Sequence, residues 1–499
     1  MNKPLICMTL TGKSLEEDMM LANKYEKVID LVELRVDHLS EDEQLYARRF
    51  PSLVNKPCLL TIRRDVDGGL FKGGEFSRTN LFARALAFAN TDRSKNFAYV
   101  DFEEDFQIPS IQDAAMAFGV RIIRSCHNMK EPITNLRERC NQMRKTGYEI
   151  PKIAFMPKTL ADLSNMFREG ERLTQYEHIF VAMGPEGLSS RILAFRSNSF
   201  LTFVSPEEML MNTTSIGHLD PNTLINLYHF DSLSKTTSLY GITGWPLKKL
   251  SSPQLFNDAF KKNKLDAVYL PIQSSYVSES LSFAAELDFK GLSITVPYRE
   301  SVLYYLHEQT PEVIQIGAAN TLVRKNNKWI GYNTDYIGFT QALEEFMGGI
   351  RIKRLKVAVL GAGGAAKAVV YALKLLGARV CIFNRTIEHA QLLAEKYGYE
   401  YAQLDSYSVE KLDEYSSLII QCTSLGMSSS QNDECTSEND PIYFYNFRGN
   451  ELLFDLVTTP QVTPLMNRAK IAGCRVCNGF KMLEYQTQAQ FKIFTGREM

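Results

Sequence analysis

The chain lacks the features that mark membrane proteins and nucleic-acid-binding proteins. It has no run of about eighteen apolar residues that could span a bilayer. Its 56 basic and 57 acidic residues give a net charge of −1, and no basic segment predicts binding to nucleic acid or to a membrane surface. Residues 1–5 lead into a short strand rather than a secretory signal. We therefore expect a soluble, cytoplasmic protein whose partners are small molecules; the sequence gives no indication of its oligomeric state.

The cysteines do not have the spacing of a disulfide framework. Nine are scattered along the chain, which is typical of reduced thiols. Cys474 and Cys477 are spaced like a redox or metal motif, but no second such pair and no paired histidines accompany them. We interpret this segment as part of a buried strand, and no metal site is predicted.

Length and periodicity predict an α/β protein with more than one domain. The 499 residues exceed what one hydrophobic core usually contains. In the first 230 residues, short apolar runs alternate with helical patterns, which is the size and rhythm of a (β/α)8 TIM barrel. Its strands are expected at 5–10, 28–36, 58–62, 98–102, 121–125, 152–156, 179–183 and 201–204.

Polar residues lie near the ends of several of these runs. Glu33 and Arg35 come late in the second run, and Arg63 follows the third. His127 ends the fifth, whereas Lys152 begins the sixth and would lie deeper. Alone, such a lysine is most often solvated, and such a histidine is most often a structural hydrogen-bonding group. Because barrel chemistry occurs at the carboxyl ends of the strands, their convergence favours catalysis.

The second half contains a nucleotide-binding pattern. An apolar run over 356–360 leads into a glycine-rich turn, a helix over 366–376 and a second strand over 379–383. Small residues at such a turn let the backbone approach a dinucleotide pyrophosphate, which the helix N-terminus stabilises. We predict a Rossmann-type domain here. The turn residues expected to contact the cofactor are Gly361, Ala362, Gly363, Gly364 and Ala365.

The end of the second strand indicates which dinucleotide is bound. It reads Asn384, Arg385, Thr386. An acidic residue there would bind the ribose hydroxyls of NAD, whereas an arginine suits a 2′-phosphate. The alternative is an arginine in a solvent-exposed turn. We predict NADP as the cofactor, with these three residues in contact with it.

Five segments of the first half resemble, in order, those of type I 3-dehydroquinate dehydratases, over nearly all of residues 1–230. They are 33–37, 61–63, 125–127, 151–154 and 182–184 followed by Arg191. The resemblance implies loss of water from a β-hydroxy ketone. Lys152 would form a Schiff base with the ketone, and His127 would move the proton. Burial would favour the neutral amine that this reaction needs.

The same resemblance implies roles for the residues around the substrate. Arg191 and Arg63 would clamp its carboxylate. Glu33 and Arg35 would bind ring hydroxyls and orient Arg63. The chain also departs from the family pattern at three positions expected to bind substrate. Asp67 replaces a glutamate that orients the histidine, and the segment that closes over the substrate is altered at Thr214 and His218.

Residues 239–499 resemble the shikimate dehydrogenase family. The matching segments are 240–244, 252–253, 295–297, 317–321, 331–338, 423–427, 455–457, 463–465, 478–479, 482–483 and 486. The resemblance implies a substrate domain over 239–340 that is completed by 478–499. The NADP-binding domain, 341–477, would be inserted between these two parts. A polar stretch over 231–238 would join this half to the barrel.

Carried over by position, five residues bind the substrate and Gly479 contacts the cofactor. Asp335 would also be catalytic, beside the carbon that exchanges hydride. Alone, Asn320 would be interpreted as a turn residue and Asp335 as a helix N-cap. The implied substrate-binding residues are Ser252, Thr295, Asn320, Asp335 and Gln486.

This half departs from its family at the centre of the site. Arg299 stands where the family has a catalytic lysine, and Leu250 replaces the first serine of a Ser-x-Ser pair. Arginine keeps the positive charge but does not lose a proton near neutral pH, so any base must be Asp335 or water. Lys248 and Lys249 are alternative carboxylate ligands.

Together the two halves predict a bifunctional enzyme. It would dehydrate 3-dehydroquinate to 3-dehydroshikimate and reduce that ketone to shikimate with NADPH. Two alternatives are kept for the second half: a quinate-type dehydrogenase and a non-catalytic module that senses a metabolite.

Overall fold

The computed structural model describes residues 3–87, 90–213, 217–247, 250–427 and 433–499. The chain divides into two compact units. The first comprises Met1–Gly241 and Pro246–Phe289, and the second comprises Ile242–Trp245 and Lys290–Met499. Each unit is described by itself.

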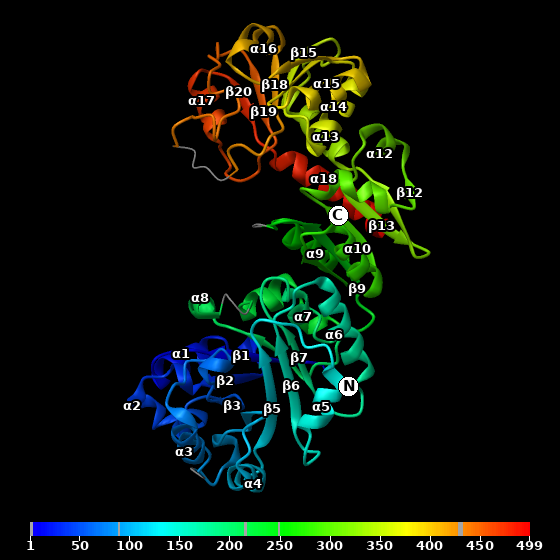
Figure 1. Ribbon diagram of the computed structural model, residues 1–499. Helices are drawn as coiled ribbons and strands as arrows, with labels where there is room; N and C mark the ends of the chain where they lie inside the picture. Colours follow the sequence, from blue (N-terminus) through cyan, green and yellow to red (C-terminus); the bar gives the residue numbers. More distant parts are fainter. Residues whose placement is uncertain (1–2, 88–89, 214–216, 248–249, 428–432) are drawn as a thin grey trace. The chain divides into compact units, whose positions relative to one another are not determined.

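The first 204 residues contain the predicted barrel. Eight parallel strands follow the order β7-β6-β5-β4-β3-β2-β1-β8 (Figure 1). A parallel bridge between His178 and Ser199 closes the sheet, so the (β/α)8 prediction is confirmed. The strands are β1 (Leu5–Leu10), β2 (Leu31–Arg35), β3 (Cys58–Thr61), β4 (Tyr99–Glu103), β5 (Arg121–Asn128), β6 (Ile150–Phe155), β7 (Ile179–Ala182) and β8 (Leu201–Val204).

Helices cover the outside of these strands. The sequence places a polar cap before several of them: Thr159 and Asp162, for example, form a capping box at the start of α6. The helices of this region are α1 (Leu15–Lys24), α2 (Glu41–Gln44), α3 (Gly74–Leu86), α4 (Pro109–Ala117), α5 (Leu136–Met143), α6 (Leu160–Arg172), α7 (Leu188–Ile192) and α8 (Leu210–Thr213).

The barrel interior changes from apolar to polar along the strands. The early residues of seven strands form an apolar cluster: Cys7, Leu31, Leu59, Ile123, Ile150, Ile179 and Leu201. Lys152 is the third residue of β6 rather than its first, because the strand begins two residues earlier than expected. Its side chain is 7% exposed, as its predicted depth requires. Lys152 and the other polar residues of the interior therefore pack against this apolar cluster.

A mixed six-stranded sheet follows, with order β10-β9-β11-β13-β14-β12. Its C-terminal helix, α18, comes from the end of the chain and contacts α13. The strands are β9 (Ser238–Gly244), β10 (Ala267–Gln273), β11 (Phe289–Ile294), β12 (Glu308–Gln309), β13 (Thr321–Lys325) and β14 (Lys328–Tyr332). The helices are α9 (Ser252–Lys262), α10 (Val277–Glu286), α11 (Tyr298–Ser301), α12 (Pro311–Ile316), α13 (Asp335–Met347) and α18 (Phe480–Thr495).

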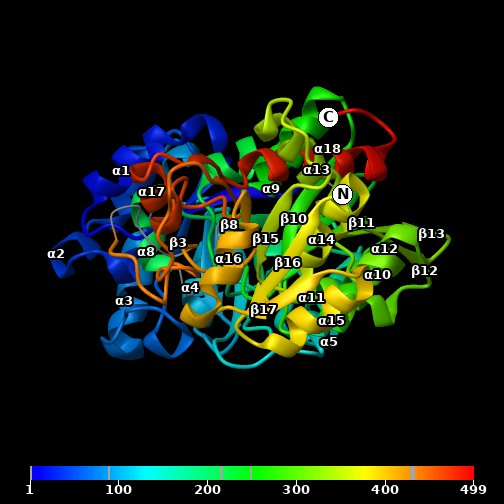
Figure 2. The ribbon, with the colours of Figure 1, turned by 90° about the horizontal axis from the view of Figure 1, so that it is seen from above.

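The glycine-rich turn belongs to a parallel, Rossmann-type sheet with order β17-β16-β15-β18-β19-β20. Figure 2 shows β15, β16 and β17 side by side. The strands are β15 (Lys356–Leu360), β16 (Arg379–Asn384), β17 (Glu400–Gln403), β18 (Leu418–Gln421), β19 (Leu452–Asp455) and β20 (Arg475–Cys477). The helices are α14 (Gly364–Leu376), α15 (Ile387–Tyr397), α16 (Val409–Tyr415) and α17 (Pro464–Ile471).

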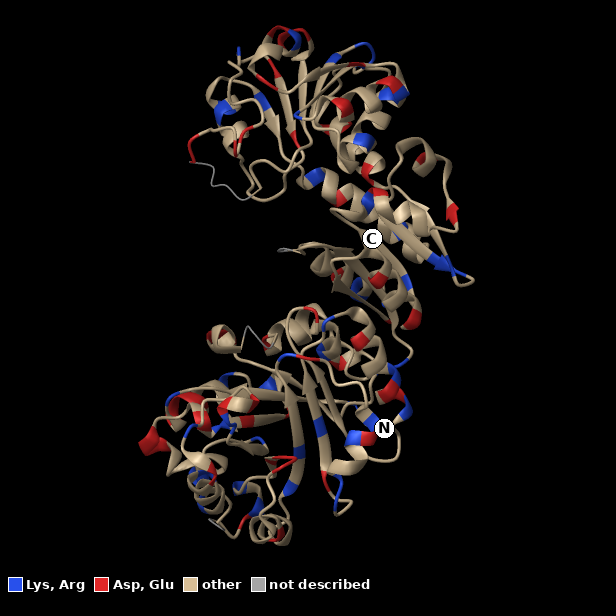
Figure 3. Cartoon of the chain, viewed as in Figure 1, with Lys and Arg blue, Asp and Glu red and all other residues tan. Residues whose placement is uncertain are grey.

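Charged residues and cysteines occur in both units. Basic and acidic residues are interspersed over both units (Figure 3). Among the described residues, no helix is both long and apolar enough to cross a bilayer. Cys477 ends the strand β20, but this strand is exposed or half-buried because it lies at the edge of its sheet, so the expectation of a buried strand was wrong. All nine cysteines are free thiols.

Candidate active sites

One layer of the barrel interior is built from the even-numbered strands. TIM barrels fill their interior with such layers, each made from alternate strands. Here β2, β4, β6 and β8 supply Glu33, Asp101, Lys152 and Phe203. Nζ of Lys152 donates to Oδ2 of Asp101 at 3.0 Å and lies 3.9 Å from Oε1 of Glu33. The same nitrogen is 4.3 Å from the centroid of the Phe203 ring. The lysine is thus held between two carboxylates and an aromatic ring.

Arg63 belongs to this carboxylate network. Its Nη2 donates to Asp101 at 2.7 Å, and its Nη1 donates to Glu103 at 2.7 Å and to Oγ of Ser125 at 3.0 Å. Glu103 also accepts a bond from Nη1 of the fully buried Arg78 at 2.5 Å. Burial alone would lower the pKa of Arg63, but Asp101 and Glu103 raise it above its ordinary value. Arg63 therefore stays charged, with both terminal nitrogens committed to protein groups.

Arg35 and Glu33, at the end of β2, are also held by protein groups. Arg35 donates through Nε and Nη2 to the two oxygens of Asp37, at 2.9 and 2.7 Å. Glu33 accepts from the hydroxyls of Thr9 and Thr61, at 2.7 and 2.9 Å. Both side chains nevertheless line the barrel pocket, so each can still present a polar atom to a ligand.

His127 lies on the same pocket as Lys152, on the penultimate residue of β5. Burial, with the cations Arg63 and Lys152, holds its pKa well below the ordinary value. Its imidazole is therefore neutral near pH 7, the form that can accept a proton. Its Nδ1 is buried and has no hydrogen-bond partner among the described residues.

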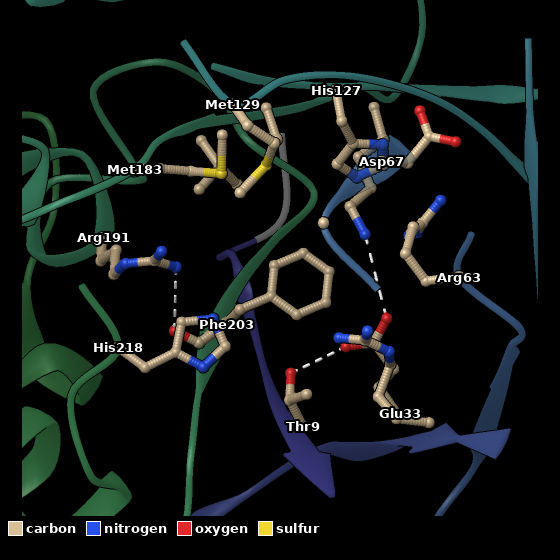
Figure 4. Close-up of a pocket in the computed structure, with 15 residues that line it drawn as sticks. Thr9, Glu33, Arg63, Asp67, His127, Met129, Met183, Arg191, Phe203 and His218 are labelled. Carbon is tan, nitrogen blue, oxygen red and sulfur yellow. Dashed lines mark hydrogen bonds and ion pairs between the residues drawn. The ribbon is translucent and has the colours of Figure 1, made fainter. Parts of the chain in front are cut away.

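Asp67 does not orient His127 through a hydrogen bond that the structure records. Its carboxylate accepts instead from Nε of Arg64 at 2.7 Å, and Arg64 also binds Asp105. Asp67 and Gly68 both line the pocket. Figure 4 shows Asp67 near His127.

Arg191 and His218 lie together on another side of the pocket (Figure 4). Burial lowers the pKa of Arg191 to about 9, so a bound anion would stabilise its charge. Removal from water, with the cations Arg191 and Arg35, holds the pKa of His218 well below its ordinary value. Thr214 lies outside the described residues.

The second unit brings three of the expected dehydrogenase residues together. Asp335 is the first residue of α13 and is fully buried. Nδ2 of Asn320 donates to its Oδ1 at 2.8 Å, and Nη1 of Arg299 lies 3.2 Å from its Oδ2. Arg299 lies in α11, shortly after β11, and Asn320 lies just before β13. Their side chains meet Asp335 at the start of α13.

Helix α18 adds one residue to this cluster, Gln490, which the sequence did not indicate. Nε2 of Gln490 donates to the carbonyl of Asn320 at 3.1 Å and to Oγ1 of Thr321 at 2.9 Å. Ser293 donates to Oε1 of Gln490 at 2.9 Å. Gln486 lies one turn earlier on the same helix and is half-buried, close to Gly338. This helix therefore ties the end of the chain to the site.

Two other residues expected to bind substrate, Thr295 and Ser252, lie next to regular secondary structure. Thr295 follows β11, and its N–H donates to the carbonyl of Thr243 at 3.0 Å. Ser252 begins α9, which belongs to the first unit. Leu250 is described and half-buried, whereas the alternative ligands Lys248 and Lys249 lie outside the described residues.

The glycine-rich turn forms a cradle at the N-terminus of the 13-residue helix α14. Gly361 has a φ of 108°, which a residue with a side chain rarely adopts. A Cβ at Gly363 would meet no atom within 4 Å, so open space lies over the helix end. Ala362 and Ala365 line the same pocket as Gly364, Arg299 and Asn384. These residues fit a pyrophosphate next to the cluster of Arg299 and Asp335.

The end of β16 borders this cradle. Nδ2 of Asn384 donates to the carbonyl of Thr386 at 2.8 Å, which fixes the turn before α15. Arg385 is exposed, so its guanidinium is available to an anion in solvent. Gly479 approaches β19 closely, because an added Cβ would lie 2.1 Å from the carbonyl oxygen of Leu456.

Sequence reasoning missed the carboxylates of β4. Asp101 and Glu103 alternate along that strand, so both face the barrel interior, and the strand itself was expected. A period-two pair of acids in a buried strand was the available signal. Gln490 left no comparable signal, because its role depends on where α18 docks.

Three protein-family models match successive segments of the chain. Residues 6–235 match the type I 3-dehydroquinase model. Residues 242–322 match the shikimate dehydrogenase substrate binding domain, and residues 342–464 match the shikimate / quinate 5-dehydrogenase model.

Individual relatives agree with these matches. The chain is 36% identical to the shikimate dehydrogenase (NADP(+)) of Carboxydothermus hydrogenoformans, over 52% of this chain and 92% of that protein. The crystal structure of shikimate dehydrogenase from Aquifex aeolicus is 32% identical over 53% of this chain and 94% of that chain, with a TM-score of 0.47. The bifunctional 3-dehydroquinate dehydratase/shikimate dehydrogenase of Arabidopsis thaliana, named chloroplastic, is 31% identical over 99% of this chain and 82% of its own length. Since that similarity runs through both halves, the chain belongs to the family of bifunctional 3-dehydroquinate dehydratase/shikimate dehydrogenases.

Proposed function

We propose that this chain catalyses two consecutive steps, dehydration of 3-dehydroquinate and reduction of the resulting 3-dehydroshikimate to shikimate. The observation that carries the first step is the buried Nζ of Lys152 on one pocket with a neutral His127. The cluster of Arg299, Asp335 and Asn320 beside the glycine-rich cradle supports the second.

In the first step, Lys152 forms a covalent bond to the ketone carbon. The amine adds to the carbonyl, and the carbonyl oxygen leaves as water, giving an iminium. His127 then removes the proton next to the iminium carbon, and the electron pair moves toward nitrogen. Loss of the β-hydroxyl follows, with the same histidine returning the proton, and water releases the product from Lys152.

Arg191 and His218 bind the substrate end that carries the carboxylate. Arg191 is the better carboxylate ligand of the two arginines, because both terminal nitrogens of Arg63 already bind Asp101, Glu103 and Ser125. Arg63 instead maintains the charge balance around Lys152. Arg35, Glu33 and Asp67 line the pocket and would face the ring hydroxyls, and Thr214 is retained as a proposed substrate ligand.

In the second step, Asp335 and Asn320 bind the ring hydroxyls together with Gln486 and Thr295. Ser252 is retained as a proposed substrate ligand. The guanidinium of Arg299 stabilises the negative charge that develops on the ketone oxygen. Because arginine keeps its proton, that oxygen receives a proton from Asp335 or from water.

The cradle residues fit NADP, which supplies the hydride when bound. Gly361, Ala362, Gly363, Gly364 and Ala365 would accommodate the pyrophosphate. Gly479, whose backbone lies close to Leu456 just after β19, is a further proposed cofactor contact. Asn384, Arg385 and Thr386 would surround the 2′-phosphate.

We further propose that the dehydratase spans 1–230, the substrate domain 239–340 with 478–499, and the NADP-binding domain 341–477. The interspersed surface charges support small molecules, rather than nucleic acid or membranes, as the partners. Nine free thiols support a cytoplasmic location.

Two measurements test this function. Borohydride treatment in the presence of 3-dehydroquinate should leave a reduced adduct on the peptide that contains Lys152. NADPH oxidation should follow addition of 3-dehydroshikimate; no oxidation with enzyme in excess would contradict the second step. Rates with shikimate and quinate, each with NADP and NAD, identify the preferred pair.

A further inference from the structure

Asp101 is a buried carboxylate that the two-step proposal does not use. Its side chain has no exposed area, and it does not line the barrel pocket, so it has no direct route to a substrate. It does contact the proposed nucleophile, since Nζ of Lys152 donates to its Oδ2 at 3.0 Å. Any role in the reaction must therefore pass through that lysine.

The orientation of Asp101 is fixed by three donors. Oδ2 accepts from Nη2 of Arg63 at 2.7 Å as well as from Lys152. Oδ1 accepts from the hydroxyl of Ser125 at 2.5 Å. A carboxylate held at both oxygens by side chains from β5, from β6 and from Arg63 just after β3 cannot rotate away when the lysine moves. It can therefore define where Nζ lies.

The charge on the lysine nitrogen explains why a permanent anion is suited to this place. In the net condensation, R–NH₃⁺ and O=CR₂ give R–NH⁺=CR₂ and H₂O, so the nitrogen carries one positive charge before and after. Two N–H bonds break, and their electron pairs form the C=N double bond. The C=O double bond breaks, and its oxygen leaves with the two protons as water. The attacking species is the neutral amine, so the fixed carboxylate acts by accepting an N–H bond that holds Nζ in place before attack and by stabilising the iminium once it has formed.

We propose that Asp101 is a positioning residue for the dehydratase: it fixes Nζ of Lys152 against the ketone and remains the counter-charge of the iminium. This inference rests on the proposed Schiff-base chemistry.

Two neighbouring groups cannot take this role. Glu33 is 3.9 Å from Nζ, and its oxygens already accept from Thr9 and Thr61. Glu103 binds Arg63 and Arg78, and no contact with the lysine is recorded. Asp101 is also unsuited to proton transfer. Burial would raise its pKa, but Arg63 and Lys152 hold the pKa well below the usual range, so it stays ionised.

The test compares Asp101→Asn with the intact chain. Asparagine keeps the size of the side chain and an acceptor oxygen but removes the charge. Asp101→Glu keeps the charge and moves it by one methylene. Glu149→Gln is the matched control, because Glu149 is a buried carboxylate just before β6 that does not line the pocket.

For each variant, kcat and KM for 3-dehydroquinate are measured together with the rate at which borohydride traps the Lys152 adduct. We expect Asp101→Asn to lower both kcat and the trapping rate by about 100-fold, with KM changed by less than about threefold. Asp101→Glu should recover at least about a tenth of the activity, and Glu149→Gln should match the intact chain.

Folding of the barrel is checked in the same samples by thermal unfolding, and NADPH-dependent reduction of 3-dehydroshikimate checks that the second unit is intact. If Asp101→Asn unfolds the barrel, Asp101→Glu supplies the comparison. Trapping by a folded Asp101→Asn at the rate of the intact chain would overturn this inference while leaving the Schiff base in place. Absence of an adduct on the intact chain would overturn both proposals.

Discussion

Nη1 of Arg299 lies 3.2 Å from Oδ2 of Asp335, and the second oxygen of that carboxylate accepts from Asn320. The two charges meet where the cradle of α14 adjoins the substrate residues. An arginine provides a permanent cation there, whereas a lysine could also exchange a proton. The pair therefore favours electrostatic stabilisation of the ketone oxygen over base catalysis by residue 299.

The variant Arg299→Lys tests this interpretation. Lysine keeps the charge but loses the planar fork beside Asp335, so we expect kcat for reduction to stay within about tenfold of the intact chain or to rise. Steady-state NADPH oxidation measures it. The dehydratase rate of the same sample is the control, and complete loss of reduction would show that the site depends on the guanidinium.

The variant Lys152→Ala should remove dehydration and leave reduction intact. Without the amine no iminium can form, so we expect kcat to fall by at least about 10³-fold. NADPH binding and reduction of 3-dehydroshikimate should be unchanged, because the glycine-rich cradle and the cluster of Arg299, Asp335 and Asn320 belong to the other unit. Product formation is followed by its ultraviolet absorbance. Residual dehydration within tenfold of the intact chain would contradict a Schiff base at this residue.

The pH dependence of dehydration should reflect the neutral state of His127. Its pKa lies well below the ordinary value, so the base form persists as the pH falls through 6.5. We expect kcat to change by less than about twofold between pH 7.5 and 6, and to fall only at lower pH as the imidazole gains a proton. His127→Gln should lose about 10²- to 10⁴-fold in rate. A single ionisation at 6.5 that His127→Gln abolishes would contradict the burial argument.

The variant Arg78→Met should destabilise the barrel. Arg78 is fully buried and donates to Glu103 at 2.5 Å and to the carbonyl of Ile62 at 3.0 Å. Removing it leaves Glu103 with one cationic partner fewer, which costs about 3–5 kcal/mol. Thermal unfolding should show a lower Tm for the barrel transition. Glu75→Gln, which removes only the half-exposed partner of Arg78, should change Tm far less.

The stability of the barrel should decrease as the pH rises through neutrality, because of Asp18. Burial raises the pKa of this carboxyl to about 7 from 3.8, against the opposing bond from the N–H of Gly12. A group with a raised pKa contributes stability that is complete below about pH 4 and lost as the pH passes 7. Asp18→Asn removes that dependence, so it should be more stable than the intact chain at pH 8, by on the order of 2–4 kcal/mol.

This prediction is measured as the difference in Tm between variant and intact chain at pH 5 and pH 8. The exposed Asp42→Asn supplies the control. If the difference in Tm were no larger at pH 8 than at pH 5, ionisation of Asp18 would not destabilise the folded barrel.

The sequence was sufficient to predict the order of the elements but not the bonds inside the pocket. Apolar runs locate strands because burial on both faces selects apolar residues, and the barrel and the turn before α14 were predicted on that basis. Strand ends were less certain: β6 begins at Ile150, which moves Lys152 from the first to the third position.

Competition between neighbouring polar groups could not be predicted from sequence. Asp67 was expected to orient His127, yet its carboxylate binds Arg64, only three residues away. Arg63 was expected to clamp substrate, yet Asp101 and Glu103 occupy its terminal nitrogens. Each outcome depends on which of several donors lies closest in the folded barrel, and motif spacing does not contain that information.

Gly364 sits against the guanidinium-bearing side chain of the dehydrogenase site. A Cβ added at this glycine would lie 3.2 Å from Cβ of Arg299 and 3.4 Å from its Cδ. An alanine in the turn would therefore need the arginine stem to give way by a few tenths of an ångström. A change in the dinucleotide cradle at this position thus displaces the cation of the neighbouring site, so the two features are mechanically coupled.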